Sequence, residues 1–305
     1  MSNKAISTLE MSHSSWIDHR YESIGASDAG AVLGINPYKS PVDVYMEKVT
    51  RTNDFEDNFN MWLGREMEPL IKKKFTLETG LKVRDDNKIR IDKEYPFLST
   101  NLDGMVVGEK VPVEYKALGF FDGEIPDYYF AQLQHQMMVT EAEYAYFAVV
   151  CLGRSRTFNV QKVDFNEEFV KLMREELVTF WNENVLQEVM PEPTNLDDIK
   201  RMYPISDPGS ILELEDSSLS QKFAILKDSR ATIKEHTDIA KAVQVEIMDY
   251  MGDKEILTKD GENLISWKQT KETRKFDAKK FAEDHPDLYE EYKEVKPGSR
   301  RFLIK

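Results

Sequence analysis

The sequence predicts an α/β protein built on a central sheet, followed by a C-terminal α+β appendage. Helical segments alternate with strand-like runs up to about residue 190, and a long helical repeat followed by short strands takes over beyond residue 215. With 41% hydrophobic and 31% charged residues among 305, the chain has the composition of an ordinary globular protein with a sizeable core. The length and the change of pattern predict two units.

In the first part, the apolar spacing of residues 62–79 predicts a helix that ends at Gly80, a common helix-stopping residue. The elements expected after it are strands at 88–92, within 96–107 and at 111–118, a helix at 126–139, strands at 144–152 and 157–163, and a helix at 167–181. This order predicts helices packed around a mixed sheet.

Residues 191–210 contain four prolines together with Gly, Ser and Asp, and they lack a sustained apolar period. Such a composition marks a connector between units. We therefore expect a first domain at 1–193, a linker at 194–215 and an accessory region at 216–305.

The accessory region begins with an apolar residue at every seventh position. These residues are Leu219, Leu226, Ile233, Ala240 and Ile247. They predict one long helix that starts at residues 216–218 and stops at Gly252. Because polar residues interrupt the intermediate seam positions, packing against the chain's own elements is favoured over an autonomous coiled coil.

A hairpin, a short helix and a final strand are expected to complete the chain. Residues 255–258 and 264–270 flank Lys-Asp-Gly-Glu, which is a hairpin signal. A helix is expected near 278–292 and a strand at the terminal RRFLIK.

The net charge of −14 argues against a protein that coats DNA with a basic surface, but an acidic exterior with a local basic channel suits a nuclease. The N-terminal run has no apolar signal region, and no apolar stretch approaches the roughly 20 residues that span a bilayer. We therefore expect a cytoplasmic protein without membrane contact. The single cysteine, Cys151, lies in an apolar run and is expected to be a buried thiol.

The main chemical signal is the segment LSTNLDGMVVGEKVPVEYKAL. If Gly108 and Glu109 form a two-residue turn, Asp103 lies opposite Glu114, and Lys116 follows on the same face. Opposed side chains have Cβ atoms roughly 5 Å apart, so both carboxylates can bind one hard cation. The other face carries Val111, Val113 and Tyr115, which are expected to pack into the core.

An isolated D-x10-E-x-K pattern is more often incidental than functional. A third carboxylate at the same place would strengthen the interpretation as a metal site. In LGREMEPLIKKKF, Gly64, Glu68, Ile71 and Phe75 share one helix face, which directs Glu68 toward the core. A carboxylate there is costly unless a cation neutralises it. The alternative is that Glu68 lies at the edge of the apolar stripe and meets water.

Five ordered motifs over residues 16–193 resemble the YqaJ-like viral recombinases, the lambda-type alkaline exonucleases of the PD-(D/E)xK nuclease superfamily. The motifs are W-x3-R-x3-IGASDAGAVLG at 16–34, G-x3-E at Gly64 and Glu68, LDG at 102–104, E-x-K at Glu114 and Lys116, and AQLQHQMMVT at 131–140. Leu102 replaces the proline of the family signature. The resemblance implies a PD-(D/E)xK restriction-endonuclease-like core.

By this resemblance, Glu68, Asp103 and Glu114 would hold Mg2+ or Mn2+, with the backbone carbonyl of Tyr115 as a further ligand. Hard oxygen ligands suit these cations. Lys116 would orient the attacking water or help to deprotonate it. The family's active-site glutamine would be Gln132, although Gln134 and Gln136 compete for that role.

The implied function is 5' to 3' digestion of one strand of linear double-stranded DNA, which leaves 3' overhangs for phage or prophage recombination. The implied partners are DNA ends, a single-strand annealing protein and further copies of the chain in a ring, plausibly a trimer. The alternatives are an endonuclease of the same fold and a DNA-binding recombination protein without catalysis.

Arg20 and Ser27 match positions that bind the terminal 5'-phosphate in this family. Ser27 is expected to cap a helix that begins at Asp28, where backbone N–H groups and the helix dipole favour an anion. Arg20 would add a bidentate phosphate contact. Alternatively, Ser27 only caps the helix and Arg20 pairs with a surface acid.

Overall fold

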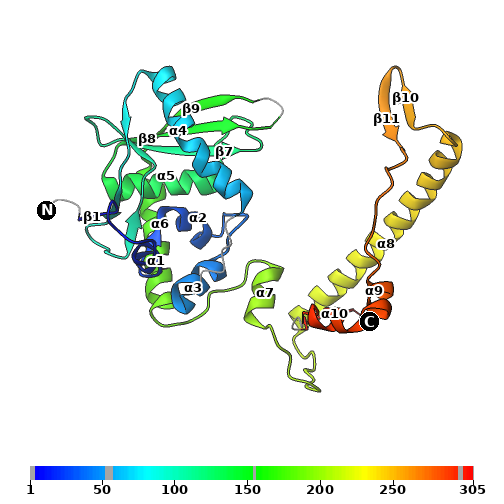
Figure 1. The fold of residues 1–305 in the computed structure, drawn as a ribbon. Coiled ribbons are helices and arrows are strands. Elements are labelled where there is room, and N and C mark those ends of the chain that lie inside the picture. Colours follow the sequence, from blue (N-terminus) through cyan, green and yellow to red (C-terminus); the bar gives the residue numbers. More distant parts are fainter. Residues whose placement is uncertain (1–3, 52–57, 154–155, 295–297, 305) are drawn as a thin grey trace. The chain divides into compact units, whose positions relative to one another are not determined.

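The computed structural model describes residues 4–51, 58–153, 156–294 and 298–304. The chain divides into two compact units, which we call unit 1 (Met1–Met202) and unit 2 (Tyr203–Lys305). Unit 1 combines helices with sheets, and unit 2 is dominated by one long helix (Figure 1).

The main sheet of unit 1 has five strands in the order β3-β6-β7-β8-β9. The strands are β3 (Val83–Arg84), β6 (Gly104–Val106), β7 (Pro112–Leu118), β8 (Tyr144–Cys151) and β9 (Phe158–Asp164). The β7–β8 pair is parallel, whereas the other three pairs are antiparallel. The expected mixed sheet of an α/β protein is therefore confirmed.

Helix α4 (Phe59–Thr79) covers one face of this sheet. The Asn58 side chain caps its first turn, and Gly80 ends it with a left-handed φ of 73°. Ile71 and Phe75 of this helix are buried, and they pack against Val113 and its neighbours on the sheet. The helix predicted to stop at Gly80 is thus confirmed.

Helix α5 (Asp127–Thr140) packs against the sheet through a separate apolar cluster. Leu133 and Met137 of the helix are fully buried against Phe147 and Val149 of β8. Since α4 and α5 use different clusters, the sheet strands are buried on both sides, as a strand between two helical layers must be.

Before residue 186, unit 1 also contains a second sheet and five further helical elements. The sheet has the order β1-β4-β5-β2. Its strands are β1 (Ala5–Ser7), β2 (Ile24–Gly25), β4 (Lys88–Ile91) and β5 (Leu98–Thr100), and the helical elements are α1 (His13–Tyr21), α2 (Ala26–Val32), α3 (Pro41–Thr50), α6 (Glu167–Thr179) and the π-helix η1 (Phe180–Val185). Apolar residues of α2, α3, α5 and α6 share one core cluster.

Two predicted elements of unit 1 have different limits in the structure. The strand run expected within 96–107 is interrupted between β5 and β6, where Asp103 leaves the ladder and its side chain accepts a hydrogen bond from the Tyr115 N–H. The helix expected at 167–181 continues as η1, so it runs further than predicted.

The connector region contains helix α7 (Leu196–Met202), which belongs to unit 1. Asp198 is buried there and accepts hydrogen bonds from the Ser40 hydroxyl at 2.6 Å and from the Thr194 N–H at 2.8 Å. A buried carboxylate with these partners ties the segment to α3. The division between the units accordingly falls after Met202.

Unit 2 contains α8 (Ser217–Met251), the hairpin β10 (Ile256–Lys259) and β11 (Glu262–Ser266), and the short helices α9 (Ala278–Asp284) and α10 (Pro286–Glu291). Asp216 caps α8 and Gly252 ends it, as predicted. Asp260 and Gly261 have φ values of 51° and 84°, which suit the tight hairpin turn expected there.

Two expectations for this region are wrong. The single helix near 278–292 is broken at Pro286, which lacks a backbone N–H and starts a new helix. Residues 301–304 of the terminal segment form no strand. Among the described residues of unit 2, the heptad residues Leu219 and Ile233 are 51% and 65% exposed, so their packing against the chain's own elements stays a prediction.

None of the described helices is both long and apolar enough to cross a membrane.

Replacing Val113 by Asp should destabilise unit 1 severely. Val113 is 1% exposed in the middle of the sheet, so the substitution buries an unpaired charge at a cost of about 3 kcal/mol or more. Urea unfolding followed by circular dichroism measures the loss. Val107→Asp is the matched control, because Val107 is 53% exposed. Equal stability of the two variants would contradict the proposed packing of β7.

Candidate active site

The carboxylates of Asp103 and Glu114 meet where β6 and β7 pair. Gly104 pairs with Val113 and Met105 with Pro112, which is the hairpin register that the sequence predicted. The Tyr115 N–H donates to Asp103 Oδ2 at 2.8 Å, so the backbone of β7 fixes the Asp103 side chain. Val113 and Tyr115 belong to the core cluster beneath α4, which leaves Glu114 and Lys116 to the opposite face.

Glu114 is 1% exposed, and both of its oxygens accept hydrogen bonds. Lys116 Nζ and Gln132 Nε2 donate to Oε1, the latter at 2.6 Å, and Gln136 Nε2 donates to Oε2 at 2.6 Å. Because a buried carboxylate is costly without such partners, these donors hold the Glu114 side chain in one orientation.

The three competing glutamines of α5 have different roles. Gln134 donates to the Asp164 carbonyl and accepts from the Asn166 N–H, so it links α5 to the β9–α6 connection. Gln132 and Gln136 both contact Glu114. Gln136 was not assigned to the site from sequence, although its i,i+4 spacing from Gln132 places the two amides on one helix face.

The charge of Glu114 and the burial of the site change the pKa values of Asp103 and Lys116. Desolvation and then the charge of Glu114 raise the pKa of Asp103 to about 8. Desolvation would lower the pKa of Lys116, but the charges of Glu114 and Asp103 outweigh it and raise that pKa above its ordinary value. The cluster therefore has a protonated lysine and a carboxyl group that binds a proton near neutral pH, as is typical of functional sites.

Glu68 approaches the cluster from α4 without joining it. Its side chain is half-buried, and desolvation followed by the charge of Glu114 raises its pKa. Glu68 does not line the cleft that Asp103 and Glu114 share. In the described part of the chain, no three His, Cys, Asp or Glu side chains are gathered closely enough to hold a metal ion.

One cleft of about 190 Å³ brings most of the predicted residues together. The predicted residues that line it are Arg20, Ser27, Asp103, Glu114, Lys116 and Gln132. Trp16, His19, Lys48, Ser99 and Asn101 also line it and were not predicted as site residues. The cleft thus joins residues near position 20 with residues near position 130. Their separation along the chain gives no sign that they lie close together.

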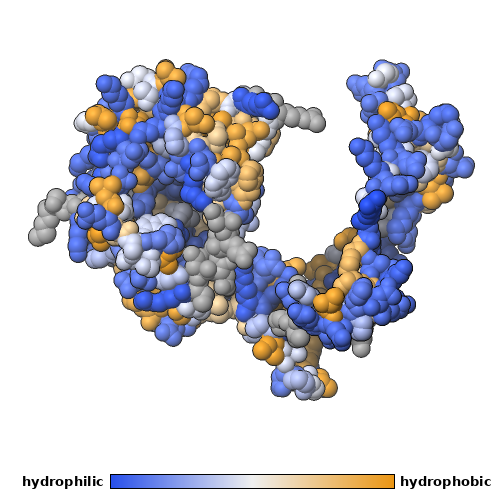
Figure 2. All heavy atoms as spheres, viewed as in Figure 1, coloured by the Kyte–Doolittle hydropathy of each residue, from blue (hydrophilic) through white to orange (hydrophobic). Residues whose placement is uncertain are grey.

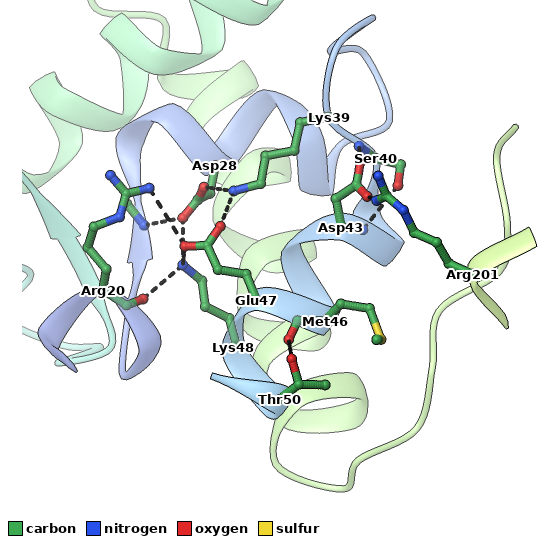
Figure 3. A network of polar contacts seen from close by, with 11 residues as sticks. Arg20, Asp28, Lys39, Ser40, Asp43, Met46, Glu47, Lys48, Thr50 and Arg201 are labelled. Atoms are coloured by element: carbon green, nitrogen blue, oxygen red, sulfur yellow. Dashed lines mark hydrogen bonds and ion pairs between the residues drawn. The ribbon is translucent and has the colours of Figure 1, made fainter. Parts of the chain in front are cut away.

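A buried ion network supports the Arg20 side of the cleft (Figure 3). The Lys48 side chain is fully buried and donates to Asp28 Oδ2 at 2.9 Å and to the Arg20 carbonyl at 2.8 Å. Lys39 contacts the other Asp28 oxygen at 2.7 Å. Desolvation would raise the pKa of Asp28, but the surrounding cations hold it well below its usual range.

Ser27 is not the helix cap that the sequence predicted. Helix α2 begins at Ala26 after the cap residue Gly25, and the Asp28 side chain accepts from the Gly25 N–H at 3.2 Å. Asp28 therefore closes the first turn, and Ser27 lies exposed within it. The Arg20 guanidinium lies 5.1 Å from the Trp16 ring and 3.7 Å from Glu47, so it has the acidic neighbour that the alternative interpretation expected.

Comparison with known proteins places the chain in a family. The sequence is 30% identical to the uncharacterized protein YqaJ of Bacillus subtilis (strain 168), over 97% of this chain and 95% of that protein. The family model described as the YqaJ-like viral recombinase domain matches residues 15–143. The chain belongs to the YqaJ-like viral recombinase family. This confirms the resemblance that the five sequence motifs indicated.

Two further comparisons relate this member of the YqaJ-like family to more distant proteins. An uncharacterized protein of Acanthamoeba polyphaga mimivirus is 24% identical over 81% of this chain, which spans 45% of that protein. The structure of LHK-Exo, an alkaline exonuclease from Laribacter hongkongensis, determined with dAMP, matches with a TM-score of 0.50 and 19% identity. The match covers 62% of this chain and 97% of LHK-Exo, and it supports the PD-(D/E)xK-type fold.

The raised pKa of Asp103 predicts how the stability of this YqaJ-like protein depends on pH when metal is removed by a chelator. Between about pH 4 and pH 8, the folded protein keeps a proton on Asp103 that the unfolded chain has lost. The stability contributed by this group is therefore fully present below about pH 4 and is lost as the pH rises to about 8.

Asp103→Asn should make this decline shallower, and urea unfolding at a series of pH values measures it. Asp122→Asn is the control, since Asp122 is exposed. Identical pH profiles for the wild type and Asp103→Asn would contradict the assigned environment.

Proposed function

We propose that the chain is a metal-dependent deoxyribonuclease whose chemistry takes place at Asp103, Glu114 and Lys116 in unit 1. The observation that carries the proposal is the pair of acidic side chains on the β6–β7 hairpin beside a lysine, at a cleft that also contains Arg20. A cleft lined by carboxylates, a lysine and a guanidinium suits a DNA end whose terminal nucleotide carries a phosphate.

The donor set fits a hard divalent cation. Desolvation and the adjacent charge of Glu114 make Asp103 bind a proton near neutral pH, and a cation between the two groups would replace that proton. Asp103, Glu114 and the Tyr115 carbonyl would hold Mg2+ or Mn2+, and Glu68 would complete the set from α4. When bound, such an ion activates water and offsets the charge that develops on the phosphate.

The remaining residues would position the reacting groups. Because its pKa is raised, Lys116 stays protonated and would orient the nucleophile and stabilise negative charge, which favours orientation over proton removal. Gln132 and Gln136 would hold Glu114 in the orientation that the cation requires.

Within this proposal, the substrate is the end of linear double-stranded DNA, digested from 5' to 3' to leave a 3' overhang for single-strand annealing. The family's description as viral recombinases and the exonuclease fold of LHK-Exo support an end-dependent enzyme. A single-strand annealing protein as partner, a ring-shaped trimer and a location in the bacterial cytosol are extensions that rest on the family resemblance.

Glu114→Gln and Lys116→Ala should each abolish cleavage and leave the fold intact. Both side chains lie on the face of β7 that does not contact α4, so their loss removes chemistry without removing the apolar core. Digestion of linear DNA with and without Mg2+ measures the effect, and circular dichroism checks folding. Lys110→Ala is the matched control, because Lys110 lies on the same hairpin with a 74% exposed side chain.

Near-normal magnesium-dependent activity in purified Glu114→Gln would overturn the site assignment. The same gel with closed circular DNA separates the two enzyme classes, since an exonuclease requires an end and an endonuclease of this fold does not. Failure of the wild type to cut either substrate with Mg2+ or Mn2+ would favour the DNA-binding protein without catalysis.

Arg20→Ala should slow the digestion of 5'-phosphorylated ends much more than that of 5'-hydroxyl ends. Arg20 lines the cleft with Ser27 and can donate a bidentate pair to a terminal phosphate. Single-turnover rates on both ends measure the preference. Arg174→Ala is the control, because its side chain is 32% exposed against 35% for Arg20 and it pairs with acids outside this cleft. Equal wild-type rates on both ends would exclude the phosphate contact.

A further inference from the structure

Helix α8 presents an apolar stripe that the described residues of unit 2 leave largely exposed. The helix has 35 residues, which corresponds to a length of about 52 Å. Along the stripe, Leu219 is 51%, Leu226 36% and Ile233 65% exposed. Figure 2 shows hydrophobic residues among hydrophilic ones on the visible surface of this unit. An isolated helix with such a stripe gains stability by burying it against a partner.

The charges of α8 are divided sharply between its two halves. Residues 217–234 carry the bases Lys222, Lys227, Arg230 and Lys234 and the single acid Asp228. Residues 235–251 carry the acids Glu235, Asp238, Glu246 and Asp249 and the single base Lys241. With His236 neutral, the first half has a net charge of +3 and the second half a net charge of −3.

We propose that α8 is a self-association surface and that its partner is the α8 helix of a second copy of this chain, bound antiparallel. In a parallel pair, the basic half would meet the basic half and the acidic half the acidic half, which is repulsive. In an antiparallel pair, each basic half lies against an acidic half, and the two helix dipoles also oppose favourably.

The apolar stripe fits this orientation when the two helices cross at Ile233. Because Leu219 and Ile247 lie equally far from Ile233, they face each other in the antiparallel pair. Leu226 and Ala240 are related in the same way, so a large side chain meets a small one. Such pairing of unlike sizes is how packed helices interdigitate.

A hollow on α8 lies where this fit requires it. It is shallow and open, and its lining residues, which include Ile233, Thr237, Ala240 and Gln244, all belong to α8 itself. In the antiparallel pair, Leu226 of the second copy faces Ala240 and would enter this hollow. The hollow therefore gives Leu226 a place to bury its side chain.

Two of the polar residues that interrupt the seam also find polar partners. In the same register, Lys222 faces Gln244 and Ser229 faces Thr237 of the second copy. Polar pairs of this kind fix the register of a helix pair at some cost in stability. They explain why the sequence pattern resembles that of a coiled coil only weakly.

The charge arrangement is tested by reversing one half of α8 in the full chain. The triple variant Lys227→Glu/Arg230→Glu/Lys234→Glu makes both halves acidic, and Glu235→Lys/Asp238→Lys/Glu246→Lys makes both halves basic. Sedimentation velocity at low ionic strength should give each variant a lower mass than the wild type, because α8 then no longer joins two copies of the chain. Circular dichroism checks that α8 remains helical.

Mixing the two triple variants should restore the wild-type mass, because an all-acidic helix then meets an all-basic one. Combining all six substitutions in one chain should also restore it, since the halves are then again opposite in charge. An unchanged mass in both triple variants would overturn the proposal, as would restoration in neither the mixture nor the sixfold variant.

Orientation is tested by disulfide cross-linking in a Cys151→Ala background, which removes the chain's one cysteine. Leu219→Cys mixed with Ile247→Cys should form a covalent dimer on oxidation, whereas Leu219→Cys alone should not. A covalent dimer from Leu219→Cys alone would show a parallel pair and contradict the proposal. Cross-linking of neither sample, together with a mass that the charge reversals leave unchanged, would show that unit 1 or DNA covers the stripe instead.

Discussion

The alternation of side chains along β7 is the constraint on which unit 1 depends. Val113 and Tyr115 enter the apolar cluster beneath α4, and the intervening Glu114 and the following Lys116 lie on the other face. Successive residues of a strand point to opposite faces. Alternate residues of β7 therefore pack into the core, and the residues between them face the site. A shift of one residue in the facing of β7 would turn both charges into the apolar cluster beneath α4 and both apolar side chains toward the cleft.

Placing charges at this depth requires partners from distant parts of the chain. Glu114 receives amide donors from two successive turns of α5, and Asp28 is surrounded by Lys39 and Lys48. A buried carboxylate without such partners would cost several kcal/mol, so these contacts fix geometry as much as they add stability. The two networks border the same cleft, which Asp28 and Glu114 both line.

Unit 2 follows a different principle. Its long helix is well capped at both ends, but among the described residues its apolar stripe is largely exposed and its two halves carry opposite net charges. In unit 1, the buried carboxylates Glu114 and Asp28 have partners within the same unit. In the arrangement that we propose, the charged halves of α8 find their partners on a second molecule. The accessory region would then contribute assembly, and unit 1 would contribute the reaction.

The sequence by itself determined the elements whose signals are local. The helix ending at Gly80, the hairpin register that opposes Asp103 and Glu114, and the limits of α8 follow from caps, turns and periodicity. Tertiary structure alone decided which glutamines reach Glu114, that Asp28 rather than Ser27 closes the first turn of α2, and that Arg20 shares a cleft with Lys116. These contacts join residues far apart in the chain, and their formation depends on how helices pack on the sheet, which no local pattern encodes.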